Sequence, residues 1–359
     1  MPKANSHIAA LDGVRAVAIL LVMTYHFWLV FQGPQGLVGK LITWGQTGVP
    51  LFFVLSGFLI TGILLDARSS LHYFKNFFAR RTLRIFPLYY ATLIVLYVLL
   101  PLAGLRAWGP FSQQFWFWIY LQNIPPTFGL PYDGPTHFWS LAVEEHYYLV
   151  WPFLVRYLNR HRLLLALAVA IAISLLSRAL LFSRYSVFYF TLCRLDGLAI
   201  GSALAVFARD PAGLQAKLRP AIFTLLVVAP AIVVSQLIFK GASTVFAQVV
   251  QSTLIVLIHG AFLVLVLTNH CGRLITAVLT NPIARSIGKY SYAMYVLHPF
   301  IMFAIRGWGL HYSVLSFLIN SVAVYACAAL SWFLLERHFL ALKDRFTTVS
   351  PPEPALSRS

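Results

Sequence analysis

The sequence is poor in charge, and above all in acidic residues. It holds 10 Asp and Glu against 27 Lys and Arg, and only 10% of its 359 residues are charged. An ordinary soluble domain carries about 25% charged residues. Hydrophobic residues make up 60% of the chain, and the mean hydropathy is +0.78. This composition argues against a soluble domain and is typical of a membrane protein with many spans.

Cysteine is scarce as well. Cys193, Cys271 and Cys327 are odd in number, widely spaced and set in apolar surroundings, so we interpret them as small core residues rather than disulfide or metal-binding thiols. The sequence also lacks a P-loop, a dinucleotide-binding glycine fingerprint and an H-E-x-x-H motif. ATP-driven pumping, hydride transfer and metalloprotease chemistry therefore have no support. We predict no bound cofactor and no metal.

Long apolar runs are what the chain has instead. The N-terminal segment lacks the basic region and cleavage motif of a signal peptide, so the first run is predicted to be a retained helix. The pattern predicts an all-α, polytopic membrane protein with about ten transmembrane helices, at residues 14–32, 47–65, 86–103, 138–157, 163–182, 189–208, 220–239, 246–268, 290–306 and 312–335. The aromatic segment 111–126 is predicted to be interfacial or re-entrant, with an eleventh, short span as the alternative.

Basic residues are spread unevenly around these spans. With the N-terminus in the cytoplasm, 20 of the 27 Lys and Arg residues fall on inner segments; the seven others are Lys40, Arg106, Arg178, Arg184, Arg194, Lys240 and Arg306. The positive-inside rule requires such a bias, which explains the net charge of +17 without a nucleic-acid partner. We therefore predict cytoplasmic termini, a membrane domain at 1–345 and a disordered cytoplasmic tail at 346–359.

The first predicted span, "LDGVRAVAILLVMTYHF", carries polar side chains on one face. Arg15 and His26 are eleven positions apart, or three helical turns plus about 20°, so they share a stripe and lie about 16 Å apart. An ionisable group inside lipid costs at least a few kcal/mol, which makes each one a candidate for function. With an ordinary pKa near 6.5, His26 is predicted to act as a general base. The structural alternative is a hydrogen-bonded core histidine.

Two further polar stretches precede or interrupt early spans. The stretch "FKNFFARRTLRIFPLYY", 74–90, sets Arg80, Arg81 and Arg84 just before a span. These arginines indicate a cytoplasmic phosphate site, or the binding of anionic lipid. Ser56-Gly57 lies in mid-span, where it favours close helix packing; a nucleophilic serine is disfavoured because the G-x-S-x-G elbow is absent.

The stretch "PTHFWSLAVEEHYYLVWP", 135–152, carries Glu144, Glu145 and His146 near the predicted outer side of a span. The two glutamates are about 100° apart on a helix, so they cannot both face one partner.

Later spans add four more candidates. Arg194 and Asp196 lie at the outer end of a span, where a structural Arg194–carboxylate pair is expected. His298 precedes Pro299, which predicts a kink. Glu336 ends the last span at its cytoplasmic edge.

Together these segments resemble the acyltransferase 3 family of integral membrane O-acyltransferases over about residues 7–345. They come in the family's order: "LDGVRAVAILLVMTYH", "GVPLFFVLSGFLI", "FFARRTLRIFPLYY", "HFWSLAVEEHYYLVWP", "RLDGLAIGSALA", "SYAMYVLHPF" and "FLLERHF". The family's arginine–ten residues–histidine signature corresponds to Arg15 and His26, and its terminal-helix glutamate to Glu336. Its tryptophan-serine-leucine…glutamate element corresponds to Trp139, Ser140, Leu141 and Glu144.

The resemblance implies a multi-pass protein of the bacterial inner membrane. Such a protein moves an acyl group, commonly acetyl, from cytoplasmic acyl-CoA as co-substrate to a hydroxyl of a cell-surface or exported carbohydrate or related metabolite. The residues expected to take part fall into three groups: His26, Glu144 and Glu336 in catalysis; Arg15, Arg80, Arg81 and Arg84 in donor binding; and Asp12, Ser56, Trp139, Ser140, Arg194, Asp196 and His298 in support.

The sequence ends soon after the last predicted span, without the extracytoplasmic SGNH-type esterase domain of larger family members. Either the membrane domain completes the transfer alone, or a separate extracytoplasmic transferase does. The alternative function is a proton-coupled secondary transporter or a flippase for a lipid-linked substrate, with the buried Arg, His and Glu as a proton relay. Against it, the sequence shows no inverted repeat.

The charge bias makes the topology testable. A reporter that is active only in the cytoplasm, fused after Arg345, is expected to give signal, because ten spans and an inward N-terminus place this position inside. A periplasm-specific reporter that is active at the same position would overturn the orientation.

Overall fold

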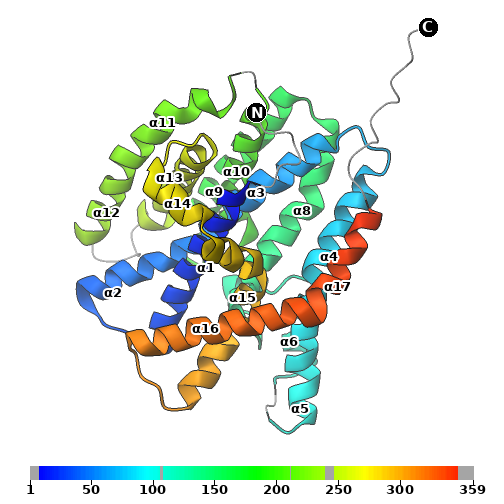
Figure 1. Cartoon of the computed structure of the whole chain (residues 1–359), viewed down its shortest axis with the longest axis vertical. Coiled ribbons are helices and arrows are strands. Elements are labelled where there is room, and N and C mark those ends of the chain that lie inside the picture. The colour runs from blue at the N-terminus through cyan, green and yellow to red at the C-terminus, as the bar shows by residue number, and fades with distance from the viewer. Residues whose placement is uncertain (1–7, 106–107, 211, 239–245, 347–359) are drawn as a thin grey trace.

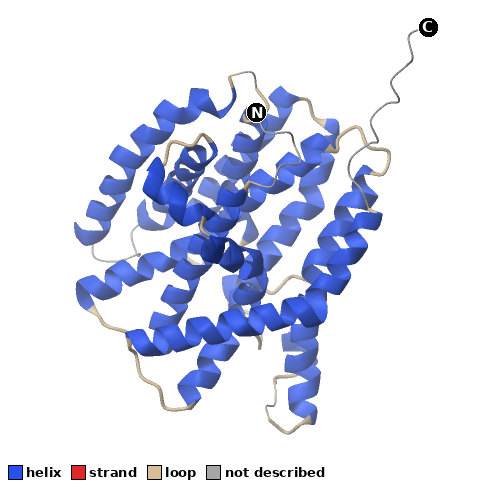
Figure 2. Ribbon diagram, viewed as in Figure 1, coloured by secondary structure: helices blue, strands red, loops and turns tan. Residues whose placement is uncertain are grey.

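The computed structural model describes residues 8–105, 108–210, 212–238 and 246–346, and these ranges contain helices and turns but no strand (Figure 2). The N-terminal half holds α1 (Ala9–Val30), α2 (Gly36–Thr43), α3 (Gly48–Asp66), α4 (Tyr73–Ile94), α5 (Leu100–Leu102), α6 (Phe111–Trp118), α7 (Ile124–Phe128), α8 (Trp139–Tyr157) and α9 (Arg160–Leu181). The C-terminal half holds α10 (Leu195–Phe207), α11 (Leu218–Phe223), α12 (Ala229–Ile238), α13 (Ser252–Leu267), α14 (Gly272–Thr280), α15 (Pro282–Gly307), α16 (Val314–Ser331) and α17 (Arg337–Ala341).

Short turns of 3₁₀- or π-helix extend or join these helices. They are η1 (Trp44–Thr47), η2 (Val95–Leu99), η3 (Thr136–Phe138), η4 (Thr191–Arg194), η5 (Gly213–Lys217), η6 (Thr224–Val228), η7 (Phe246–Gln251), η8 (Trp332–Glu336) and η9 (Leu342–Arg345).

The predicted spans coincide with helices. Seven segments are long and apolar enough to cross a membrane: Ala9–Val30, Gly36–Asp66, Tyr73–Leu102, Arg160–Leu181, Gly213–Val234, Val249–Leu267 and Val314–Ala341. The other three predicted stretches are also helical, at α8, at η4 with α10, and at α15. An all-α, polytopic membrane protein is thereby confirmed. The orientation stays a prediction, and the tail from residue 347 lies outside the described residues.

One detail of the third predicted span differs from expectation, and the alternative of an eleventh span at 111–126 is excluded. The basic stretch is not a separate segment before the span, because α4 runs unbroken from Tyr73 and continues through η2 to Leu102. Arg81 and Arg84 therefore belong to the spanning helix itself. The segment 111–126 forms the eight-residue α6 and the start of α7, and eight residues extend only about 12 Å, so it is not an eleventh span.

Helix α1 lies at the centre of the bundle and packs against α3, α14 and α15 (Figure 1). Its contact with α15 recurs at two levels: Gly288 lies against the backbone of Asp12, and His298 lies against His26. Residue numbers rise in the same direction along both helices, so the two are parallel. Parallel packing is what the predicted first and ninth spans require.

A second close contact joins α3 to α10. A Cβ atom on Gly57 would collide with the backbone of Leu198, and one on Gly201 would collide with the backbone of Val54. The absence of both side chains lets the two backbones touch, as small residues do between membrane helices. The packing role predicted for Gly57 is confirmed.

Asp196 has a different partner from the one predicted. Arg178 of α9 donates to Asp196 at 2.9 Å, and both side chains are buried. Arg178 also donates to the carbonyls of Cys193 and Val249, at 2.7 and 3.1 Å. The expected Arg194–Asp196 pair is wrong, because the long Arg178 side chain reaches the carboxylate from the neighbouring helix. Arg194 instead lies over the Phe188 ring, 4.5 Å from its centroid, and donates to the Phe188 carbonyl at 2.8 Å.

The α3–α10 contact predicts opposite effects for two glycines on one helix. Gly57→Ala is expected to destabilise the protein by about 1–3 kcal/mol, because overpacking pushes α10 away. Gly62→Ala is the matched control: its nearest neighbour is the flexible end of Arg209 at 3.5 Å, and alanine favours a helix over glycine. Thermal unfolding in detergent measures both. Equal melting temperatures for the two variants would contradict the contact.

Candidate active site

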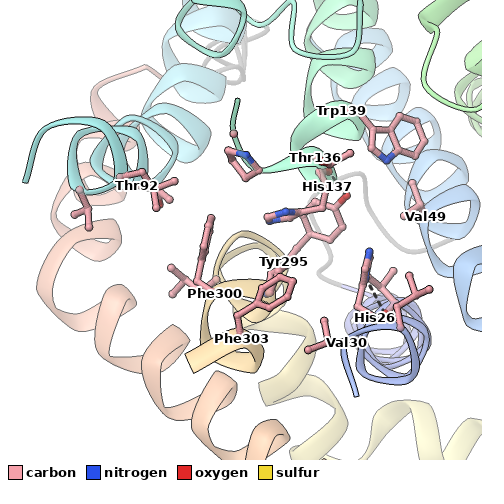
Figure 3. A pocket seen from close by; sticks show the side chains of 18 of the residues that line it. His26, Val30, Val49, Thr92, Thr136, His137, Trp139, Tyr295, Phe300 and Phe303 are labelled. Carbon is pink, nitrogen blue, oxygen red and sulfur yellow. Dashed lines mark hydrogen bonds between the residues drawn. The ribbon is translucent and has the colours of Figure 1, made fainter. Parts of the chain in front are cut away.

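A large cavity of about 930 Å³ opens between α1, α4, α15 and the loop before α8. This volume lies within the range of about 300–1,000 Å³ that is usual for small-molecule sites. Aromatic and aliphatic side chains form most of its lining, and His26 and His137 are among its polar groups. Figure 3 shows the His26 ring rising from α1 into the space between Val49, Tyr295 and His137.

Three histidines from different parts of the chain lie side by side here: His26 and His137 line the cavity, and the buried His298 lies against both. His26 Nδ1 lies 3.1 Å from His298 Nε2, and the two ring centroids are 4.9 Å apart. His137, on η3, has its ring centroid 5.4 Å from that of His298. Two nitrogens that face each other do not point at a common ion. Within the described residues no group of three or more His, Cys, Asp and Glu is arranged as a metal site.

His137 was not among the residues predicted from the sequence. The only signal was its place in the predicted "PTHFWS" stretch, two residues before Trp139. The fold gives it a role because η3 turns its Nε2 toward the Val296 carbonyl, at 3.1 Å, on the same helix as His298. Trp139 itself lines the cavity and packs edge-to-face on Phe53.

A second, smaller cavity of about 110 Å³ lies among α1, α3, α4, α8 and α15. Arg15, Arg81 and Arg84 line it together with Ser56 and Glu144. Three of the four predicted donor-binding arginines are therefore gathered from two helices. The fourth is not: Arg80 does not line this cavity and donates to the Phe346 carbonyl at 3.0 Å.

Glu144 is held inside the arginine cluster. Arg81 Nη2 lies 3.3 Å from Glu144 Oε2, and the Tyr148 hydroxyl donates to the same oxygen at 2.6 Å. Ser56 in turn bonds the Tyr148 hydroxyl, and the Arg81 guanidinium stacks 3.9 Å from the Tyr148 ring centroid. Helix α4 carries Arg81 into the bundle beside α8, so Glu144 lies among the arginines. The side of the membrane that it faces stays a prediction.

The remaining acidic candidates also lie near arginines. Asp12 accepts a hydrogen bond from Arg15 Nη1 at 2.9 Å. Glu336 is buried, accepts from the Ser331 hydroxyl at 3.0 Å, and interacts electrostatically with Arg84. Because three arginines share the small cavity with Glu144 as its one lining carboxylate, the cavity is expected to attract anions.

The two cavities touch at a common wall. Val49 and Tyr295 line both of them. The Tyr295 hydroxyl donates to the His137 carbonyl at 2.7 Å and lies 2.5 Å from the Ser140 hydroxyl. Ser140 lines the small cavity and Trp139 the large one. One tyrosine side chain therefore separates the arginines from the histidines.

Comparison with known proteins bears on what this pair of cavities does. The chain is 34% identical over 226 residues to a protein of Listeria monocytogenes named peptidoglycan O-acetyltransferase OatA, covering 56% of this chain and 34% of that protein. It is 35% identical over 225 residues to a putative peptidoglycan O-acetyltransferase, YrhL, of Bacillus subtilis, covering 56% of this chain and 33% of that protein. A putative O-acetyltransferase of Staphylococcus aureus strain COL is 27% identical over 330 residues, covering 82% and 51%.

The chain spans about a third to a half of the length of these relatives. No solved structure matches it significantly. The family described as "Acyltransferase domain" matches residues 8–336, a range that contains both cavities and every residue that joins them. With nearly the whole described chain inside that match, the protein belongs to the acyltransferase 3 family.

Proposed function

We propose that this protein transfers an acyl group, acetyl in the first instance, from acyl-CoA on the cytoplasmic side to a hydroxyl of a cell-surface carbohydrate. One observation carries the proposal: an arginine-lined cavity and a histidine-lined cavity share the Val49–Tyr295 wall. Acyl-CoA is a polyanion with a neutral thioester at the far end of a long arm. A cationic site followed by a base about three helical turns away suits that shape.

The size of the small cavity defines which part of the donor it takes. At about 110 Å³ it lies well below the usual range for ligand sites, so it is too small for a nucleotide and suits only a narrow part of the molecule. Arg15, Arg81 and Arg84 would hold the phosphates at its mouth, and the arm would pass Tyr295 to reach His26. Arg80, which lies outside the cavity, is left for the nucleotide or for lipid headgroups.

At His26 the reaction is a simple acyl exchange. His26 takes the proton of the acceptor hydroxyl while the hydroxyl oxygen bonds to the acyl carbon. The carbon–sulfur bond breaks, and the CoA sulfur leaves with the proton returned from His26. The products are an ester and CoA as the free thiol. The apolar cavity wall excludes competing water. A covalent acyl-histidine is the second chemical route from the same arrangement.

The acceptor would enter the large cavity. Its lining includes Trp108, Trp139, Phe188 and Tyr189, with Asp133 among them. Flat aromatic faces with a few polar groups are the usual lining of small-molecule sites and suit a sugar ring. The relatives named peptidoglycan O-acetyltransferase point to a carbohydrate of the cell surface.

Arg15→Lys tests the donor site. Lysine keeps the charge but loses the paired donors that suit a phosphate, so binding of acetyl-CoA to purified protein is expected to weaken while insertion and folding persist. Calorimetric or fluorescence titration measures it. An unchanged affinity would make Arg15 a structural partner of Asp12 alone.

His26→Gln tests the reaction itself. Purified wild-type protein is expected to release CoA from acetyl-CoA when a carbohydrate acceptor is supplied, and a transporter would release none. Glutamine fills similar space but takes no proton, so turnover should fall by about 10²–10⁴-fold. Affinity for acetyl-CoA should stay close to wild type, because Arg15 lies about 16 Å from His26 along α1. Near wild-type turnover would remove the base role from His26 and leave His137 as the other cavity histidine to test.

A further inference from the structure

The contact between His26 and His298 links the cavity to a fully buried group. His298 has no exposed surface, whereas His26 is half-buried and lines the large cavity. His26 Nδ1 and His298 Nδ1 each also lie near backbone carbonyls, which can only accept a hydrogen bond. The hydrogen positions in both rings therefore follow from the chemistry of those neighbours.

The first constraint comes from helix α15. His298 Nδ1 lies 2.8 Å from the Tyr295 carbonyl and 3.1 Å from the Met294 carbonyl. A carbonyl oxygen only accepts, so Nδ1 carries the hydrogen. The Tyr295 carbonyl has room for this bond because residue 299, four positions on, is proline and has no N–H to donate to it. Pro299 thus leaves a free carbonyl for the side chain of the residue before it.

The second constraint is charge. A doubly protonated His298 would be a fully buried cation, at a cost of several kcal/mol unless an anion pairs with it. The polar atoms bonded to its ring are two carbonyls and His26. A neutral ring has one N–H, which is already on Nδ1, so His298 Nε2 presents a lone pair to His26.

The hydrogen on His26 is then fixed as well. His26 Nδ1 lies 3.1 Å from His298 Nε2 and 3.1 Å from the Val22 carbonyl. Both neighbours accept, so Nδ1 must be the donor, and His26 Nε2 is left without a hydrogen. That nitrogen belongs to the ring that projects into the large cavity (Figure 3).

We propose that His298 is a positioning residue: through its hydrogen bond to Nδ1 it holds His26 in the tautomer whose free Nε2 faces the cavity. This positioning role rests on the proposed function, in which His26 Nε2 takes the proton of the acceptor hydroxyl. His298 also accepts a stronger hydrogen bond once His26 is protonated, which stabilises the cation that forms during transfer. In this arrangement a buried imidazole does what a carboxylate does in a serine-hydrolase triad.

The decisive measurement is the tautomer, and it needs no substrate. In ¹⁵N-histidine-labelled protein in lipid bilayers, NMR distinguishes a protonated ring nitrogen from an unprotonated one. The His26 signal, identified by its loss in His26→Gln, is expected to show hydrogen on Nδ1. His137 is an internal control for the method: its Nε2 faces the Val296 carbonyl, so it should show the opposite tautomer. Hydrogen on Nε2 of His26 in the wild-type protein would overturn the proposal.

Two substitutions at His298 separate positioning from packing. His298→Leu removes the acceptor, so the His26 signal should lose its single Nδ1–H form and turnover should fall by about 10²–10⁴-fold, with the KM for acetyl-CoA unchanged. His298→Gln places a carbonyl oxygen near the Nε2 position and should retain most of both properties. His146→Leu is the matched control, since His146 bonds Thr191 and the Tyr120 carbonyl and does not line either cavity.

The outcomes distinguish this proposal from the function on which it rests. The expected tautomers without any CoA release would leave the positioning role intact and refute the transferase. CoA release with an unchanged His26 tautomer in His298→Leu would refute the positioning role and leave the transferase intact. If His298→Leu does not fold, the wild-type spectrum and the His298→Gln variant still decide.

Discussion

The packing of α1 against α15 is the contact on which the rest of the site depends. At one level Gly288 lets α15 touch the backbone of Asp12, the partner of Arg15. At the other level His298 reaches His26. Because both contacts join the same two parallel helices, a shift at the glycine contact would move the histidines as well. The same pair of helices thus sets both the depth of the arginine and the orientation of the base.

Buried charge is handled in two distinct ways in this bundle. Arg178 and Asp196 form an ion pair with each other. Arg178 also donates to two backbone carbonyls, and Asp196 accepts from the Thr253 hydroxyl, so the hydrogen bonds of both groups are made within the protein. Arg15, Arg81 and Arg84 instead line a cavity that also contains Glu144. A buried ion pair whose hydrogen bonds are all made within the protein is costly to break, and it has no free donor with which to bind a ligand. A cluster with more cations than lining carboxylates remains available to an anion, which is why the proposed donor site lies here and not at Arg178.

Val49 and Tyr295 form the wall between the arginine-lined cavity and the histidine-lined cavity. The tyrosine is held by His137 and Ser140, so its ring stays between the two cavities. Under the proposed function, a charged donor that approaches through the arginines would meet this ring before the histidines, whereas an acceptor in the large cavity would lie beside His26. Under the same proposal, this partition would let a charged donor and a neutral sugar reach one base from different sides, without a water-filled path across the bilayer.

The sequence by itself determined the helical membrane fold, the stripe that joins Arg15 to His26, the packing role of Gly57 and the missing N–H at Pro299. Each follows from local rules: hydropathy over a span, the period of a helix, the absence of a side chain and the absence of an N–H. Only the tertiary structure placed Glu144 among the arginines, gave Asp196 to Arg178 rather than Arg194, and brought His137 to the cavity. These pairings join residues on different helices, and in a bilayer where all spans are apolar, hydropathy does not encode which helices become neighbours. Which helices become neighbours depends on the length of the side chains and on close backbone contacts between helices.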